Sequence, residues 1–146
     1  ANLRHPGSYS GMDDFISGGF KEVIDDSSTD TKKVRKVLFC SGKMFFDLEE
    51  RKQKDKRSDV AIIRIEQLYP LPVKQLEALY GKYNKATWFW IQEEPLNMGA
   101  ASYLQMNLKS INFGIISRQS SASTATGYNK VHLQEQMELI ETAFSI

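Results

Sequence analysis

The chain has 146 residues, of which 41% are hydrophobic and 25% are charged, and its formal net charge is +1. This length and composition are typical of one globular domain with its own core. The near-neutral charge excludes the strongly basic classes of protein and gives no reason to expect a nucleic-acid or membrane partner.

Cysteine and histidine are scarce. The single cysteine, Cys40, lies in the apolar run VLFC, and the two histidines, His5 and His132, are far apart in sequence. One cysteine excludes a disulfide framework and fits a reducing compartment, and the three residues form no metal-ligand pattern. We therefore expect no metal site. No apolar run is long enough to cross a bilayer, and no signal peptide is recognisable.

The beginning of the chain has neither a helical nor a strand period. Residues 1–19 carry four glycines, at positions 7, 11, 18 and 19, and the chain begins with Ala1 rather than methionine. We interpret residues 1–19 as a connector from an upstream domain that this sequence does not contain. The predicted folded domain covers residues 20–146.

Five strands are predicted from runs of apolar and β-branched residues. They cover residues 20–26, 34–41, 59–70, 85–95 and 113–119. Most of these runs are continuously apolar rather than alternating, which indicates a parallel sheet covered on both faces. The leading strand is short and ends in acidic residues, so we expect it to be antiparallel at an edge.

Four helices are predicted after these strands, over residues 44–56, 72–83, 97–111 and 129–143. In the first, only the apolar start should touch the core, and the basic run Lys52–Arg57 should be a solvated helix end. Asn97 is the expected N-cap of the third. In the last, one apolar stripe is predicted, made of Leu133, Met137, Ile140 and Phe144. The alternation of strands and helices predicts an α/β fold, a three-layer α/β/α domain with a mostly parallel sheet of about five strands.

The loops that follow parallel strands meet at one edge of the sheet, where ligands usually bind. Here they are SGK (41–43), QLYPLP (67–72), QEEPLNMG (92–99) and RQSSASTATG (118–127). Ser41 and Lys43 before a helix could hold a phosphate, and Arg118 could pair with an anion. A plain turn and a structural ion pair are the respective alternatives. The glycine spacing of a nucleotide-binding P-loop is absent.

Glu93 and Glu94 are consecutive residues at the end of an extended segment. Their side chains should point to opposite faces of the sheet, which suits neither an acid–base pair nor a shared metal ion. We therefore expect structural or interface roles for both, with the following helix N-terminus or Arg118 as a partner for one of them. No serine–histidine–acid set is visible, and we predict no catalytic residue in this chain.

Six motifs occur in a characteristic order: LRHP, GGFKEVIDD, LFCSGKMFFDL, VAIIRIEQLYPLP, WIQEEPLNMGA and ISRQSSASTATGYNKVHLQEQ. Together they resemble, over nearly the whole chain, the C-terminal domain of the decarboxylase component of 2-oxoglutarate dehydrogenase. The resemblance implies the transketolase C-terminal fold. It also implies a parent enzyme of the tricarboxylic acid cycle that uses thiamine diphosphate and magnesium, decarboxylates 2-oxoglutarate and passes the succinyl group to a lipoyl arm.

In this family the cofactor is held by upstream domains, so the resemblance implies that this chain binds no cofactor and is inactive alone. The implied partners are the upstream domains of the same polypeptide, a homodimer mate and the succinyltransferase component, in the bacterial cytoplasm or the mitochondrial matrix. In related enzymes an acyl-CoA or AMP can bind around this domain, which we carry over only to Ser41, Lys43 and Arg118. Two features depart from the family pattern: Phe45 and Phe46 replace frequent tyrosines, and Thr124 replaces a frequent proline.

Two alternatives remain open. The chain could be the same domain of a 2-oxoadipate or other 2-oxoacid decarboxylase, because the substrate contacts of this family lie upstream. It could also be a free-standing nucleotide- or acyl-CoA-binding module. The complete open reading frame separates the last possibility from the others.

Overall fold

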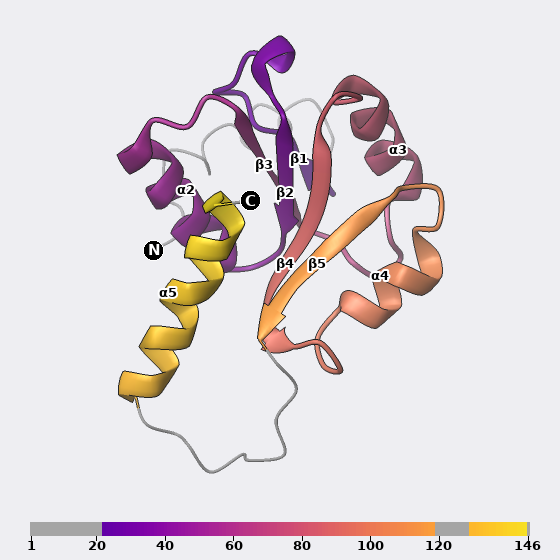
Figure 1. The fold of residues 1–146 in the computed structure, drawn as a ribbon. Helices are drawn as coiled ribbons and strands as arrows, with labels where there is room; N and C mark the ends of the chain where they lie inside the picture. The colour runs from indigo at the N-terminus through magenta and orange to yellow at the C-terminus, as the bar shows by residue number, and fades with distance from the viewer. Residues whose placement is uncertain (1–21, 119–128, 146) are drawn as a thin grey trace, which may run out of the picture.

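A five-stranded sheet lies between two layers of helices in the computed structural model, which describes residues 22–118 and 129–145 (Figure 1). The strands are β1 (Val23–Ile24), β2 (Lys36–Cys40), β3 (Val60–Ile65), β4 (Thr87–Pro95) and β5 (Phe113–Arg118), in the spatial order β1-β3-β2-β4-β5. Strands β2 to β5 are parallel, and β1 pairs antiparallel with β3. The mostly parallel sheet and its antiparallel leading strand are therefore confirmed, although β1 and β3 are shorter than predicted.

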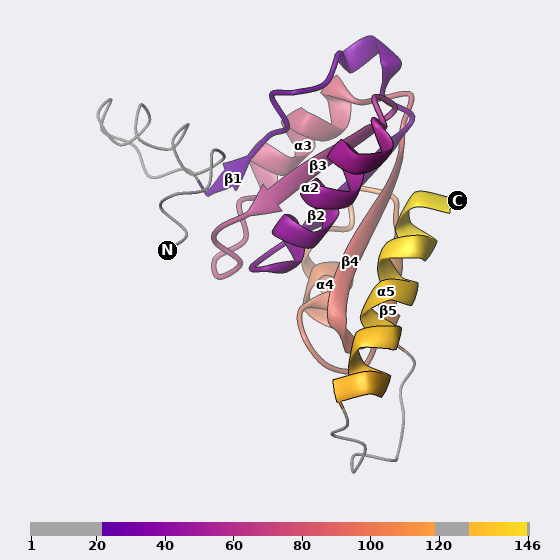
Figure 2. The same ribbon diagram turned by 90° about the vertical axis from the view of Figure 1, so that its left-hand side faces the viewer.

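The helices divide between the two faces of the sheet. Helices α2 (Met44–Asp55) and α5 (Asn129–Ser145) cover one face, and α3 (Val73–Lys82) and α4 (Ala101–Asn107) cover the other. Figure 2 shows α2 in front of the strands and α3 and α4 behind them. A short 3₁₀ helix, η2 (Thr31–Lys33), precedes β2. The predicted three-layer α/β/α arrangement is confirmed.

The inner strands bury side chains on both faces, as their continuous apolar sequences predict. On β2, Val37 and Phe39 face α3 and α4, whereas Leu38 and Cys40 face α2 and α5. Phe39 is the centre of an aromatic cluster, with its ring centroid 5.3–5.5 Å from those of Trp88, Trp90 and Phe113. Aromatic rings prefer such tilted and edge-on contacts, so the cluster favours one particular arrangement of its side chains.

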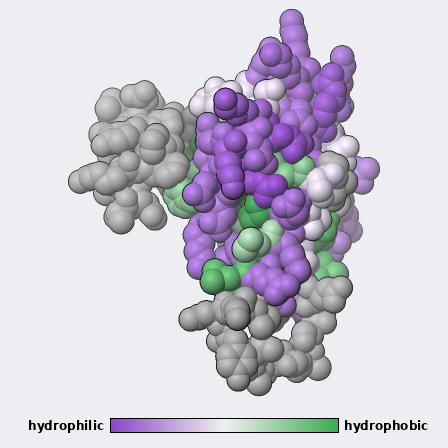
Figure 3. All heavy atoms as spheres, turned by 60° about the vertical axis from the view of Figure 1, so that its left-hand side comes forward, coloured by the Kyte–Doolittle hydropathy of each residue, from purple (hydrophilic) through white to green (hydrophobic). Residues whose placement is uncertain are grey.

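The predicted stripe of α5 is wrong in its first half. Leu133 and Met137 are 61% and 70% exposed, whereas Ile140 and Phe144 are buried together with Leu139 and Ala143. The inward side of α5 carries Leu139, Ile140, Ala143 and Phe144, and Gln136 on the same side bonds to Asp47 of α2, so Leu133 and Met137 lie outside it. Figure 1 also shows the start of α5 extending beyond the tips of β4 and β5. Figure 3 shows the result as a mainly hydrophilic surface with a few hydrophobic side chains.

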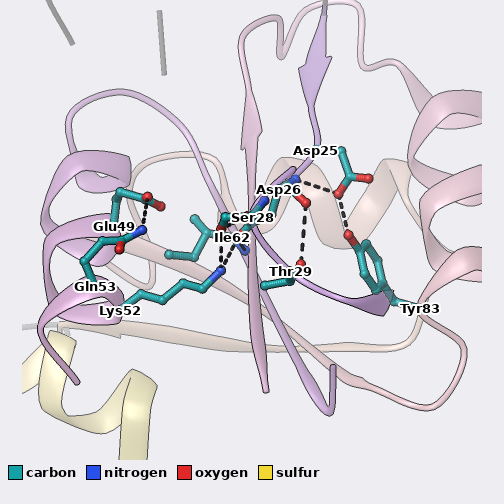
Figure 4. Close-up of polar contacts among 9 residues, drawn as sticks. All are labelled: Asp25, Asp26, Ser28, Thr29, Glu49, Lys52, Gln53, Ile62 and Tyr83. Atoms are coloured by element: carbon teal, nitrogen blue, oxygen red, sulfur yellow. Dashed lines mark hydrogen bonds and ion pairs between the residues drawn. The ribbon is translucent and has the colours of Figure 1, made fainter. Parts of the chain in front are cut away.

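Helix α2 also differs from its prediction. We expected its charged end to be solvated, but Lys52 is buried and its Nζ lies 2.6 Å from Oδ2 of Asp26. The same carboxylate accepts a hydrogen bond from the backbone N–H of Ile62 at 2.9 Å and further bonds from Ser28. A charge this deep is tolerated only because it is paired and hydrogen-bonded, and this cluster supplies both (Figure 4).

The preceding residue, Asp25, binds the opposite helical layer. Its carboxylate accepts hydrogen bonds from the Tyr83 hydroxyl, at 2.7 Å, and from Lys82, both at the end of α3. Figure 4 shows Asp25 and Asp26 pointing to different sides of the chain, toward Tyr83 and Lys52 respectively. Two consecutive aspartates at the end of β1 thus tie the helices of both layers to one edge of the sheet.

The C-terminal end of α5 is anchored near the beginnings of β2 and β3. Lys36 Nζ donates to the carbonyl of Ala143 at 2.6 Å, and Arg57 donates to that of Phe144 at 2.7 Å. Cations at a helix C-terminus satisfy carbonyls that have no helical partner and oppose the helix dipole favourably. The Phe144 ring also lies beneath the guanidinium groups of Arg51 and Arg57.

We predict that Asp26→Asn destabilises the domain by about 3 kcal/mol, because Lys52 would stay buried without its counter-charge. Asp55→Asn, which breaks the surface pair with Arg51, is the matched control and should have little effect. Urea unfolding of both variants measures the difference. Equal, small losses in the two variants would show that the buried pair is not a main determinant of stability.

The same contribution should depend on pH. Burial alone would raise the pKa of Asp26, but the ion pair with Lys52 and the hydrogen bonds from Ser28 and Ile62 outweigh it and hold the pKa below 3.8. A depressed carboxyl pKa stabilises the fold fully above the unfolded value, and this stabilisation is lost as the pH falls through the folded one. The gap in stability between the wild type and Asp26→Asn should therefore close in that acid range.

Candidate functional site

The segments that follow β2, β3 and β4 lie at one edge of the sheet, as the topology predicts (Figure 1). A cleft of about 360 Å³ lies there, between the turn after β2, the segment after β3 and the end of β4. Its polar and aromatic lining includes Ser41, Lys43, Tyr69, Glu93 and Glu94. This cleft is the candidate site that the sequence predicted from loop positions.

Gln92 organises the wall of this cleft. The residue is only 3% exposed, and its Oε1 accepts hydrogen bonds from Trp90 Nε1 at 2.8 Å and from the backbone N–H of Ala101 at 3.0 Å. Its Nε2 lies 2.8–3.1 Å from the carbonyl oxygens of Glu94, Pro95 and Met98. One amide side chain therefore holds the whole loop from β4 to the start of α4.

Sequence analysis did not identify Gln92, although a signal was present. Gln92 follows Trp88 and Trp90 at a spacing of two, so it faces the same core as they do. Asn97 is the N-cap predicted for the next helix, but that helix begins four residues later and Gln92 accepts from its first N–H. Gly99 has a φ of 70°, in the left-handed region that favours glycine, and a Cβ there would make a tight contact, 3.1 Å from Gln92 Oε1.

Glu93 and Glu94 occupy different sides of the strand end. Glu93 also lines a second hollow, between α2 and α5, while the Glu94 carboxylate lies against Gly99 on the side of α4. Neither has an ion pair or a side-chain hydrogen bond within the described residues. The structure does not show the expected pairing of a glutamate with the α4 N-terminus or with Arg118. Gln92 accepts from the first N–H of α4, and Arg118 contacts residues of α5.

Ser41 and Lys43 lie in one turn around Gly42, whose φ is 67°, and both line the cleft. Arg118 is elsewhere: it lines a separate hollow between β5 and α5. The structure therefore brings two of the three residues of the predicted phosphate site together and leaves Arg118 apart from them. Binding of an acyl-CoA or AMP phosphate by these residues stays a prediction. Lys130, His132 and Thr124 lie outside the residues whose side chains are described.

Arg118 belongs to a polar network that joins three elements. Its guanidinium lies 3.4 Å from Glu135 and donates to Gln136 at 3.3 Å, both on α5. Gln136 in turn donates to Asp47 of α2 at 3.0 Å. The alternative that the sequence left open for Arg118, a structural ion pair, is thus present in the structure.

Phe45 and Phe46 have a role that needs no hydroxyl group. Their rings pack edge-on at 5.3 Å, and the Arg64 guanidinium lies over them, 4.6 Å from the centroid of Phe45. Arg64 is buried and its Nε is 2.8 Å from a carboxylate oxygen of Glu66. Stacking on aromatic faces is a common way to place an arginine in a dry environment.

No group of three or more histidine, cysteine, aspartate or glutamate residues could hold a metal ion within residues 22–118 and 129–145. Cys40 is buried, and burial raises the pKa of its thiol far above the ordinary range.

The fold and this sheet edge define the class of protein: a mostly parallel α/β domain in which the end of β4 continues into a loop held by a buried glutamine. The profile of the 2-oxoglutarate dehydrogenase C-terminal family matches residues 9–144, and the chain belongs to this family. The resemblance inferred from the motifs is therefore confirmed.

Individual relatives agree with the family assignment. The chain is 41% identical to the 2-oxoglutarate dehydrogenase E1 component of Haemophilus influenzae, over 98% of this chain and 16% of that protein. It is 38% identical to the oxoglutarate dehydrogenase of Buchnera aphidicola and 36% identical to the E1 component of Azotobacter vinelandii, each over 99% of this chain. The chain thus spans about a sixth of the length of the curated relatives it matches. Within its described part, no helix is long and apolar enough to cross a membrane.

We predict that Gln92→Ala costs about 3 kcal/mol of stability, since it leaves Trp90 Nε1 and several buried backbone groups without partners. Amide exchange of Met98 to Ala101 should accelerate, and the emission of the tryptophans should change. Gln53→Ala, which removes an exposed bond to Glu49, is the control. Unchanged exchange in the loop would contradict the role assigned to Gln92.

Proposed function

We propose that this chain is the C-terminal domain of a thiamine diphosphate- and magnesium-dependent decarboxylase component that acts on 2-oxoglutarate. The observation that carries the proposal is the family match over residues 9–144, together with relatives that are named 2-oxoglutarate dehydrogenase E1 components. In the parent enzyme, 2-oxoglutarate is decarboxylated and the succinyl group is transferred to the lipoyl arm of the succinyltransferase component. We place this reaction in the tricarboxylic acid cycle, as the resemblance of the motifs implies.

We further propose that the domain serves assembly and leaves the chemistry to upstream domains, which hold the cofactor. The surface of the cleft edge supports this role. Tyr69, Leu96 and Met98 are 65%, 46% and 59% exposed, and the Tyr69 ring packs against Tyr103 with centroids 4.4 Å apart. Large apolar side chains that gather on an exposed edge are typical of a surface that contacts protein.

Glu93 and Glu94 belong to the same edge and are proposed interface residues. Their carboxylates have no charged partner within the described residues, so cationic groups of an upstream domain or of a homodimer mate would complete them. The parent enzyme is expected in the bacterial cytoplasm or in the mitochondrial matrix. A 2-oxoadipate or other 2-oxoacid decarboxylase with the same domain is the alternative, because this domain carries no substrate contact that we can assign.

The first test concerns activity. The 146-residue chain, supplied with thiamine diphosphate, Mg²⁺ and 2-oxoglutarate, should release no carbon dioxide, while the polypeptide encoded by the complete reading frame should. Both are measured in the same assay. Thiamine-dependent turnover by the shorter chain would refute the division of labour that we propose.

The second test separates assembly from chemistry. In the longer polypeptide, Glu93→Gln and Glu94→Gln should weaken the dimer or lower its melting temperature, because an interface charge pair would be lost. The rate per assembled dimer should stay within about twofold of wild type. Glu77→Gln, at an exposed position of α3, is the control. A loss of several decades in turnover by a correctly assembled dimer would make these residues catalytic instead.

A further inference from the structure

The two edge strands of the sheet, β1 and β5, differ in length and in the partners of their backbone groups. At one edge β1 has only two residues, and the carboxylate of Asp26 takes the N–H of Ile62 on β3 beyond it. At the other edge β5 continues for six residues, Phe113–Arg118, and within the described residues its one partner strand is β4. Proteins usually shorten, charge or cover an edge strand, since its free backbone groups invite pairing with another chain.

β5 carries none of the usual protections. Before Arg118 its sequence is Phe113, Gly114, Ile115, Ile116 and Ser117, with no proline and no charged residue. In a parallel pair the ladder bonds to β4 occupy one side of the strand. Within the described residues, no backbone bond joins the other side of Phe113–Ser117 to another element.

A groove runs along this strand. It has a volume of about 500 Å³ and lies between β5 and α5, with Phe89, Ile116 and Leu139 among its apolar lining. Its rim on α5 carries Glu135, Glu138 and Thr142. Arg118 lies beside Glu135 within ion-pair distance, whereas Glu138 is exposed and has no ion pair within the described residues. The groove therefore combines an open strand edge, an apolar floor and one uncompensated negative charge.

We propose that β5 is a docking edge for an extended, basic segment of another polypeptide, which adds to the sheet as a sixth strand. Backbone bonds to β5 would supply affinity, as in other cases of strand addition. An apolar side chain of the segment would enter the groove above Ile116 and Leu139, and a lysine or arginine two residues along would face Glu138. Side chains two apart in a strand share one face, so one segment can satisfy both.

A second copy of this chain fits the edge less well. Two β5 strands that pair about a two-fold axis would form one continuous sheet, which places both α5 helices on the same face. Glu135 and Glu138 of one copy would then approach those of the other, and like charges across an interface oppose association. The charge of the groove thus favours a basic partner over self-pairing.

The test uses the 146-residue chain and a blocked seven-residue peptide with valine, lysine and valine at its second, fourth and sixth positions and threonine elsewhere. Amide exchange of Phe113–Ser117 should be fast in the chain alone at all concentrations and should slow when the peptide is added. Glu138→Lys should weaken peptide binding by about fivefold, the size expected for reversing one exposed charge pair. Glu50→Lys on α2 should leave binding unchanged.

Several outcomes would overturn the proposal. Absence of protection with the peptide would remove β5 as a docking edge. Equal binding of a peptide with glutamate in place of lysine would remove the role of Glu138. Protection in the chain alone would assign the edge to another occupant: a segment of the same chain if protection does not depend on protein concentration, or a second copy if it does.

Discussion

The structure depends on how the edge of β3 is completed. A two-residue strand cannot pair with the whole of β3, and an unpaired buried N–H costs about as much as a lost hydrogen bond. In place of the missing strand, the carboxylate of Asp26 accepts a hydrogen bond from the backbone N–H of Ile62. This buried carboxylate stays ionised because the ammonium group of Lys52 is paired with it. The ion pair between Asp26 and Lys52 therefore positions α2 over the sheet. The neighbouring Asp25 positions the end of α3 through its hydrogen bond with Tyr83.

From that edge the constraints pass across the sheet to the loops. β3 aligns β2, and β2 aligns β4 through its register, so the end of β4 lies beside the turn of Ser41. There Gln92 converts a strand end into a shaped loop by occupying backbone groups on both sides of it. The outcome is a sheet edge whose loop has a defined shape and which carries two glutamates and exposed apolar side chains.

Much of the fold could be predicted from sequence because it follows from local patterns. The apolar runs around Phe39, Ile63 and Trp90 gave the inner strands, and the alternation with helices gave the layers. The contacts that fix how the helices lie on the sheet are long-range. Asp26 and Lys52 are 26 residues apart, and Lys52 lies in a basic run whose composition predicts exposure to solvent. Gln92 has the same difficulty, because its partners become visible only when the loop after it is folded. The stripe on α5 failed for a simpler reason, since periodicity alone cannot tell which of several apolar positions face the sheet. The assignment of the family, by contrast, depended on the order of motifs, which no single residue carries.

The anchoring of α5 has a consequence for how the polypeptide is made. Helix α5 completes the core on the α2 side with Leu139, Ile140, Ala143 and Phe144. Its last carbonyls accept hydrogen bonds from Lys36 and Arg57. During synthesis, α2, α3 and α4 can pack on the sheet before the residues of α5 leave the ribosome, so the part of the sheet that α5 covers is closed last. Until then apolar side chains opposite α5, such as Phe89 and Ile116, are open to solvent, and that nascent surface is what a chaperone at the ribosome exit would meet.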